Sequence, residues 1–164
     1  MKPDLIIGPR DNPQTYRWHI FRWRGWQLSL HKWFRSDDDR ALHDHSGHNL
    51  SIILNGGYFE IVREWLPEDC VGHGSAWKHA GDGEYYCDVT KFRWPLVPYF
   101  RRAETPHRIE LPNDGRPVWS LWLRWPPIRE WGFHCPKGWR HWREYCAERD
   151  YNASGVSTIG KGCD

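Results

Sequence analysis

Apolar and polar residues alternate along much of the chain. In Arg17-Trp18-His19-Ile20-Phe21-Arg22-Trp23, bulky apolar side chains are interleaved with arginine and histidine. Such alternation is typical of half-buried β-strands. Turn signals at Gly25, Gly56-Gly57 and Asn113-Asp114-Gly115 separate the strand patterns. The predicted strands cover about residues 16–23, 26–34, 39–45, 49–55, 57–65, 96–102, 107–111 and 117–125. Many short strands joined by turns predict a sandwich or a barrel, here with a barrel core over about residues 16–125.

The remaining segments predict a loop, one helix and a tail. Residues 67–91 are rich in Gly, Asp and His without a clear period, so we expect a long loop or irregular hairpin over one mouth of the barrel. Residues 137–151 predict the one substantial helix, and residues 152–164 a flexible tail. At 164 residues, the chain is long enough for one domain, which we place at residues 1–151.

Charge and composition narrow the classes of partner. The formal net charge is +2, which points to neither a nucleic-acid binder nor a membrane-surface protein. No apolar run approaches the roughly 18 residues of a membrane span, and the N-terminal residues lack a signal-peptide core. The five cysteines are an odd number without a Cys-x-x-Cys motif. We therefore expect a soluble cytoplasmic protein with reduced thiols.

The chain contains 13 tryptophans, many of them next to polar or basic residues. Most are expected to pack in the core and along sheet edges, and some to line a cavity that receives a flat ligand. Interleaved Arg and Trp residues could instead form stacking platforms for single-stranded nucleic acid, which stays open as an alternative partner.

Histidines provide the main candidate chemistry. His43 and His45 are separated by one residue, so in an extended strand they point to the same face. His107 begins another strand pattern far along the chain. Neutral imidazole is the commonest protein ligand of transition metals, and a His-x-His pair needs only one or two further donors to form a site.

These residues carry a resemblance to the cupin superfamily, small double-stranded β-barrels (jelly rolls) that usually hold one metal. The matching features are His43-x-His45, an apolar strand, Gly56, and Pro106-His107 followed by a strand, over about residues 39–125. Where the family motif has a glutamate, this chain has Asn49 or Leu50. The local sequences Leu42-His43-Asp44-His45 and Trp131-Gly132-Phe133 also resemble those of small uncharacterised cupins from bacterial and phage genomes. This resemblance implies no particular substrate.

The resemblance implies an all-β barrel with a metal held by His43, His45 and His107. Three protein ligands leave coordination positions open, as in catalytic sites. Three histidines without a carboxylate resemble the thiol dioxygenases of the superfamily, which use Fe(II); Zn or Ni would satisfy the same nitrogens. Three neutral ligands also leave the ion's charge uncompensated, which favours an anionic substrate.

Other residues are candidates for catalysis or for a fourth ligand. Tyr58 and Glu60 share one face of a predicted strand, and Glu60 is a candidate ligand or general base. His48 and Glu104 are further candidates for a fourth ligand. Asp44 is expected to face away from the two histidines beside it, in a supporting or surface role.

Substrate recognition is expected to fall to arginines and one tryptophan around the mouth. Guanidinium groups present a planar fork of donors that suits a carboxylate or phosphate. The candidates are Arg102, Arg108, Arg124, Arg129 and Trp122. Trp122 and Arg124 share one face of the last strand, but alternation does not say whether that face or the opposite one lines the cavity. The segment 128–133 is predicted to fold over the barrel edge as a lid or a plug.

Two functional classes follow. The first is a metal-dependent cupin enzyme, taken as a mononuclear non-haem iron oxygenase acting on a small polar or anionic molecule, with metal-dependent isomerisation or hydrolysis as a variant. The second is a non-catalytic module that binds a nucleotide, a sugar or single-stranded nucleic acid. An exposed barrel edge would also allow a homodimer.

Overall fold

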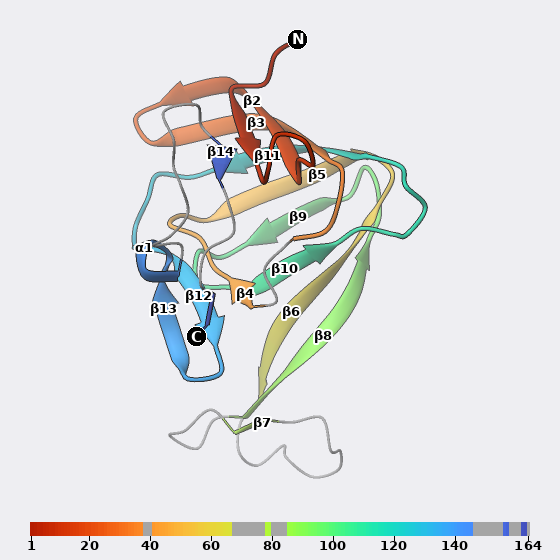
Figure 1. Ribbon diagram of the computed structural model, residues 1–164. Helices are drawn as coiled ribbons and strands as arrows, with labels where there is room; N and C mark the ends of the chain where they lie inside the picture. The colour runs from red at the N-terminus through yellow and green to blue at the C-terminus, as the bar shows by residue number, and fades with distance from the viewer. Residues whose placement is uncertain (38–40, 67–77, 80–84, 146–155, 158–161, 164) are drawn as a thin grey trace.

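The computed structural model describes residues 1–37, 41–66, 78–79, 85–145, 156–157 and 162–163. Nearly all of its regular structure is β, arranged as two seven-stranded sheets (Figure 1). One sheet has the order β14 (Val156–Ser157), β1 (Leu5–Ile7), β2 (Thr15–Trp23), β3 (Trp26–Trp33), β11 (Val118–Arg124), β5 (Asn49–Asn55) and β9 (Pro98–Arg101). The other has the order β13 (Gly138–His141), β12 (Gly132–Cys135), β4 (Leu42–His43), β10 (His107–Glu110), β6 (Tyr58–Leu66), β8 (Tyr85–Arg93) and β7 (Lys78–His79).

The strand pairing confirms the expected all-β, double-stranded barrel. Every pairing is antiparallel except that of β1 with β14. Alternation decides which side chains face inward: along β5 the residues are alternately buried and partly exposed from Asn49 to Ile53. A small apolar core consists of Ile53, Tyr58, Ile109, Leu111 and Val118. Polar and apolar side chains of the inner face together line the cavity described below.

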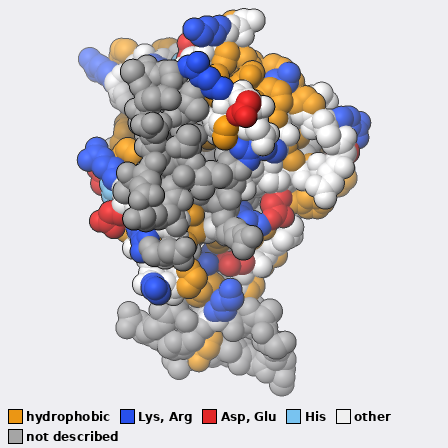
Figure 2. Space-filling model, in the orientation of Figure 1, with side chains coloured by type: hydrophobic (Ala, Val, Ile, Leu, Met, Phe, Trp, Pro, Cys, Tyr) orange, Lys and Arg blue, Asp and Glu red, His pale blue; other side chains and the backbone are white. Residues whose placement is uncertain are grey.

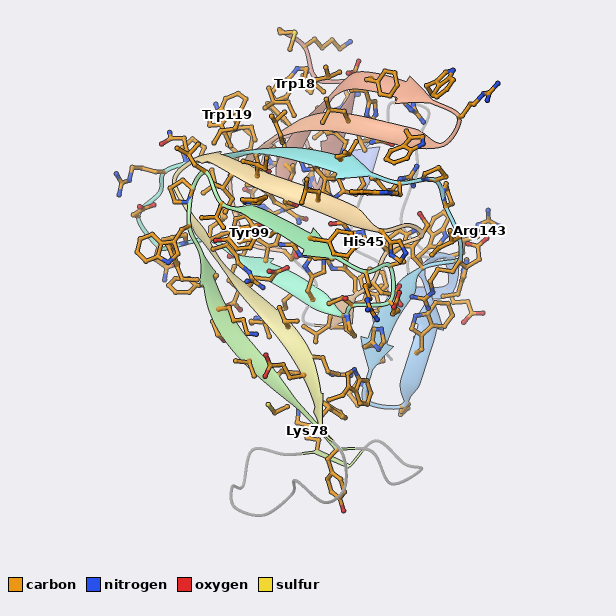
Figure 3. All side chains as sticks on the ribbon, turned by 180° about the vertical axis from the view of Figure 1, so that it is seen from behind. Trp18, His45, Lys78, Tyr99, Trp119 and Arg143 are labelled. Carbon is orange, nitrogen blue, oxygen red and sulfur yellow. A yellow bond between two sulfur atoms is a disulfide. The ribbon has the colours of Figure 1, made fainter. Side chains whose placement is uncertain are left out.

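Tryptophans pack mainly ring against ring. On the outer side of the first sheet, Trp18 stacks on Trp119 with ring centroids 5.7 Å apart, away from His45 (Figure 3). Trp131 and Trp142 stack in the same way at 5.7 Å. Basic and acidic side chains are interspersed over the described part of the face in Figure 2, in keeping with the nearly balanced charge.

The segment after β6 contains more strand than its composition predicts. Residues 85–91, expected in a long loop, belong to β8, which pairs with the whole length of β6. Together with β7, these strands form an arm that projects away from the rest of the molecule (Figure 1). The pairing explains the strand, because the weak pattern of β8 is supported by hydrogen bonding to a full-length partner. Residues 67–77 and 80–84 of the expected loop lie outside the described residues.

The C-terminal region differs from the predicted helix and tail. Residues 138–141 form β13, a hairpin partner of β12, and helix α1 covers only Trp142–Tyr145 in the described part of the chain. Gly138 at φ +119° makes the turn that sends the chain back along β12. Residues 146–151 lie outside the described residues. In the expected tail, Val156 and Ser157 pair with β1.

A disulfide also ties this region down. Cys135 on β12 is bonded to Cys163, which corrects the expectation of reduced thiols for these two residues. Cys87 is free. The sequence could not predict this disulfide, because the cysteine count is odd, the two cysteines are far apart in the chain, and only the fold brings them together. No helix in the described part of the chain is long and apolar enough to span a membrane.

Candidate metal centre

The three predicted histidines meet between the two sheets. His43 on β4 is the register partner of His107 on β10, so the two imidazoles are neighbours across the ladder. His45 follows β4, and its backbone N–H donates to the carbonyl of Ala103, 2.8 Å away. The three rings have centroids 4.8–5.3 Å apart, and one ring nitrogen from each lies within 4.8 Å of the others.

The nitrogens fit a single ion. Nε2 of His45 and Nε2 of His107 are 2.8 Å apart. Two imidazole ligands at about 2.1 Å from one ion and at a right angle to each other would be roughly 3.0 Å apart. Burial lowers the pKa of His45 well below its ordinary value, helped by the neighbouring His107 and His43. Burial likewise lowers the pKa of His107 to about 4, although Glu60 opposes the shift. At neutral pH both rings are therefore uncharged and can offer a lone pair.

Glu60 lies behind His107, on the side away from the cluster. Its Oε1 is 2.5 Å from Nδ1 of His107, and the side chain is fully buried. This contact assigns the Nδ1 proton and leaves Nε2 as the free acceptor, the arrangement found behind metal-binding histidines. Arg101 also donates to Oε1, and Arg93 donates to Oε2 at 2.5 Å. Both oxygens are thus occupied, so Glu60 supports His107 and is not placed as a direct ligand or an open base.

The charge of Glu60 is set by these partners. Burial alone would raise the pKa of Glu60, but Arg101 and His107 outweigh it and hold the pKa far below the usual range. Glu60 is therefore ionised. Arg101 extends the network, donating to Ser51 Oγ at 3.0 Å and to the Tyr58 hydroxyl at 3.3 Å. Burial raises the pKa of Tyr58, so its hydroxyl stays protonated.

One aspartate lies beside His43, and another fixes the strand that carries it. Asp37, which the sequence reasoning missed, has Oδ2 4.0 Å from Nδ1 of His43 and accepts from the backbone N–H of Ile109 at 2.7 Å. Asp37 lies in the run Asp37-Asp38-Asp39, and a run of acidic residues is usually exposed to solvent, so the sequence pattern offers no reason to select it. Asp44 is fully buried and faces away from the cluster, as expected. It accepts from Arg129, the Gly132 backbone N–H and Trp139, at 2.7, 2.7 and 2.9 Å, and thereby fixes β4 against the β12–β13 hairpin.

The remaining candidates for a fourth ligand lie elsewhere. Nδ1 of His48 accepts from the backbone N–H of Ala103 at 2.9 Å. Glu104 is exposed. Within the described residues, the group of potential ligand atoms that could hold an ion contains only His43, His45 and His107.

A cavity of about 260 Å³ adjoins the cluster. It is lined by the three histidines, by Tyr58, and by Trp122 and Arg124, which settles the orientation of β11 that alternation leaves open. Trp131 and Phe133 also line it, so the segment 128–133 contributes a wall of the cavity.

Three of the predicted arginines are placed away from this cavity. Arg102 is exposed, Arg108 pairs with Glu110, and Arg129 is bound to Asp44. The cavity lining contains other polar residues instead, which the sequence reasoning did not select: Gln14, Arg17, His31, Asn49, Ser51, Arg101 and Ser120. Except for Gln14, which precedes β2, they occupy inward positions of their strands, and only the register identifies those positions.

The sequence matches no family model, and no curated protein is significantly similar to it. Solved structures are similar in fold at low identity. Hydroxypropylphosphonic acid epoxidase from S. wedmorenis has 12% identity and a TM-score of 0.46, with 73% of this chain and 54% of that chain covered. A cupin superfamily protein from Desulfitobacterium hafniense has 14% identity and a TM-score of 0.43, with 73% and 94% covered. An uncharacterized conserved protein with a double-stranded β-helix domain from Klebsiella pneumoniae has 10% identity and a TM-score of 0.48, with 78% and 90% covered.

The chain spans about half the length of the epoxidase structures that it matches. Strand order and register, which come from the structure itself, define the fold independently of these similarities. The chain folds as a double-stranded β-barrel of two seven-stranded sheets, with a three-histidine group on the wall of its cavity.

Proposed function

We propose that this protein is a mononuclear metalloenzyme, a non-haem iron oxygenase that acts on a small polar or anionic molecule. The observation that carries the proposal is the convergence of three histidine nitrogens, within 4.8 Å of one another, on the wall of a cavity. Structural zinc sites are normally completed by four protein ligands, whereas three leave room for substrate. His43, His45 and His107 would hold the ion, and bound Fe(II) would supply redox chemistry with oxygen.

The protein groups around the cluster would orient the substrate and exclude water. Glu60 keeps the Nδ1 proton on His107, so that the ring's Nε2 stays available. Tyr58 lines the cavity with a protonated hydroxyl, which can donate a hydrogen bond to a bound molecule. Trp122, whose ring centroid is 6.1 Å from that of His45, provides a flat surface beside the cluster.

The charge of the cavity favours an anion. Three neutral imidazoles would not compensate a divalent ion, and Arg17 and Arg124 line the same cavity, in which Arg101 is already paired with Glu60. The volume of about 260 Å³ is below the ~300–1,000 Å³ usual for drug-sized ligands, so the substrate would be of metabolite size.

Metal analysis of protein purified without chelator tests the proposal. We expect close to one ion per chain, lost in His43→Ala and His107→Ala. His48→Ala is the matched control, because His48 lies near the cluster but outside it. Protein that contains no metal, and that takes up none of Fe(II), Zn(II) or Ni(II) in titration, would contradict the proposal.

The reaction needs a separate test, because the same nitrogens also suit zinc and nickel. Oxygen uptake by the Fe(II)-loaded protein, screened with small thiols and carboxylic acids, should respond to one class of compound and be lost in His107→Ala. If zinc or nickel is the resident ion and no compound supports oxygen uptake, metal-assisted isomerisation or hydrolysis replaces the oxygenase assignment.

A further inference from the structure

Two polar residues outside the three-histidine group lie next to each other on the cavity wall. Asn49 on β5 and Arg124 on β11 are register partners in the first sheet. Both line the cavity, and Asn49 is fully buried. Asn49 stands where the cupin resemblance would place a carboxylate ligand, yet it is not part of the potential metal-binding group.

Both side chains carry hydrogen-bonding atoms without a protein partner. Among the described residues, nothing pairs with Nδ2 or Oδ1 of Asn49, or with Nε of Arg124. Buried polar groups are nearly always paired, and those that are not call for a ligand, a water molecule or a functional explanation. The two residues therefore offer adjacent N–H donors, one from an amide and one from a guanidinium.

The charge of Arg124 is also uncompensated within the described part of the chain. Its other donors go to Ser46 Oγ at 3.0 Å and to the Gly25 carbonyl at 3.4 Å, neither of which is a carboxylate. By contrast, the half-buried Arg129 is paired with Asp44, and the buried Arg101 with Glu60. Burial lowers the pKa of Arg124, as expected for a guanidinium held away from water without a counter-charge.

The position of this pair links it to the histidines from two sides. Ser46, which accepts from Arg124, directly follows His45. On the other side, Asn49 is the register partner of Arg101, whose acceptor Glu60 binds His107. Trp122 lies two residues before Arg124 on β11 and lines the same cavity.

We propose that Arg124 and Asn49 form an oxyanion subsite, which binds a carboxylate or phosphoryl group of a small substrate beside the three-histidine centre. A compact oxyanion can accept from both residues and neutralise the guanidinium at the same time. The inference deepens the proposed function by naming the substrate class, and the substrate role rests on that function. The anion-binding role does not, because it needs no metal.

Isothermal titration of the metal-free full chain with acetate and with inorganic phosphate tests the subsite. We expect one of the two anions to bind at one site per chain, and Arg124→Gln to weaken it by about 10–100-fold, as for loss of a charged hydrogen bond. Asn49→Leu should weaken the same anion by about 3–10-fold, as for a neutral hydrogen bond. Arg102→Gln is the matched control, since Arg102 is exposed and outside the cavity, and its affinity should equal that of the unaltered protein.

The tighter-binding anion identifies the group as carboxylate or phosphoryl. If neither anion binds the unaltered protein, or if Arg124→Gln binds as tightly as Arg102→Gln, the subsite does not exist. Circular dichroism verifies that each variant folds. If Arg124→Gln does not, Arg124→Lys decides: it keeps the charge without Nε, and an unchanged affinity in both Arg124→Lys and Asn49→Leu would overturn the proposal.

Because these titrations contain no metal, their result is separable from that of the metal analysis. Anion binding that depends on Arg124 in a protein that takes up no metal would retain the subsite and refute the metalloenzyme. Metal uptake with no Arg124-dependent anion binding would retain the metalloenzyme and refute the subsite.

Discussion

Nδ1 of His107 lies 2.5 Å from Oε1 of Glu60, with the carboxylate fully buried and held by two arginines. The contact decides which nitrogen of His107 faces the cavity. It also makes a residue from β6 part of a centre built on β4 and β10, because Glu60 and Ile109 are register partners on neighbouring strands. The metal-binding capacity of the cluster should therefore depend on a residue that does not touch the ion.

Replacing Glu60 by Gln should weaken metal binding by about 10–100-fold, the usual effect of losing a carboxylate behind a histidine ligand. It should also destabilise the fold by about 3–5 kcal/mol, because Arg101 is left buried without a counter-charge. Competition titration with a metal indicator and urea unfolding measure the two effects. Glu64→Gln is the control: Glu64 pairs with Lys91 at the surface, where such a pair contributes at most about 1 kcal/mol. Equal metal affinities in the two variants would contradict the role assigned to Glu60.

Asp44 should matter for stability more than for chemistry, although it sits between two candidate ligands. Asp44→Asn removes a buried charge that accepts from Arg129, Trp139 and the backbone of Gly132. We expect a loss of about 3–5 kcal/mol, since Arg129 loses the carboxylate with which it is paired. Urea unfolding measures the change, with the exposed Asp114→Asn as control. A variant as stable as the unaltered protein would show that Asp44 does not hold the β12–β13 hairpin.

The three-histidine centre could be predicted because two local patterns contain its ligands and the cupin resemblance joins them into one site. A period of two places His43 and His45 on one side, and Pro106-His107 marks the start of a strand. Each pattern involves only a few neighbouring residues, so it can be recognised without knowledge of the rest of the fold. The roles of Glu60 and Asp37 are not local: each depends on which strand or loop lies beside a histidine, and the sequence of β6 gives no indication that β10 is its neighbour.

The cavity lining could be predicted only in part, for a related reason. Alternation separates Trp122 and Arg124 from Trp119 correctly, but the choice of the inward face comes from the partners β3 and β5. The same ambiguity led to Arg102 in place of Arg101, since neighbours on a strand point to opposite faces. Near the C-terminus, the sequence pattern predicts a helix over residues 137–151, but residues 138–141 pair with β12 as a strand. The pattern of one segment cannot show such a pairing.

Breaking the disulfide should loosen the C-terminal region and destabilise the protein. Cys135 and Cys163 are 28 residues apart, and a cross-link closing a loop of this length contributes about 2–4 kcal/mol. Cys135→Ser should therefore unfold at lower urea concentration than Cys87→Ser, the control at a free cysteine. Reducing agent should destabilise the unaltered protein but leave Cys135→Ser unchanged. Two free thiols at these positions in non-reduced peptide mass spectra would contradict the pairing.

The buried His31 should make the stability of the protein fall in acid. His31 is only 3% exposed, and burial lowers its pKa well below the ordinary value, with Arg17 and His19 acting in the same direction. Below about pH 6.5 the unfolded chain therefore binds a proton at this position that the folded chain does not, so the free energy of unfolding decreases as the pH falls. One such group contributes a slope of up to about 1.4 kcal/mol per pH unit, present between its folded and unfolded pKa values.

His31→Gln removes this titration and should flatten the pH dependence by that amount between about pH 6 and 5. Urea unfolding at half-unit pH intervals, on metal-free protein, measures both slopes. The buried His45 and His107 also have lowered pKa values and keep part of the acid sensitivity in the variant. Equal slopes in the variant and the unaltered protein would mean that His31 takes up its proton in the folded state, and therefore that the cavity wall around it is open to water.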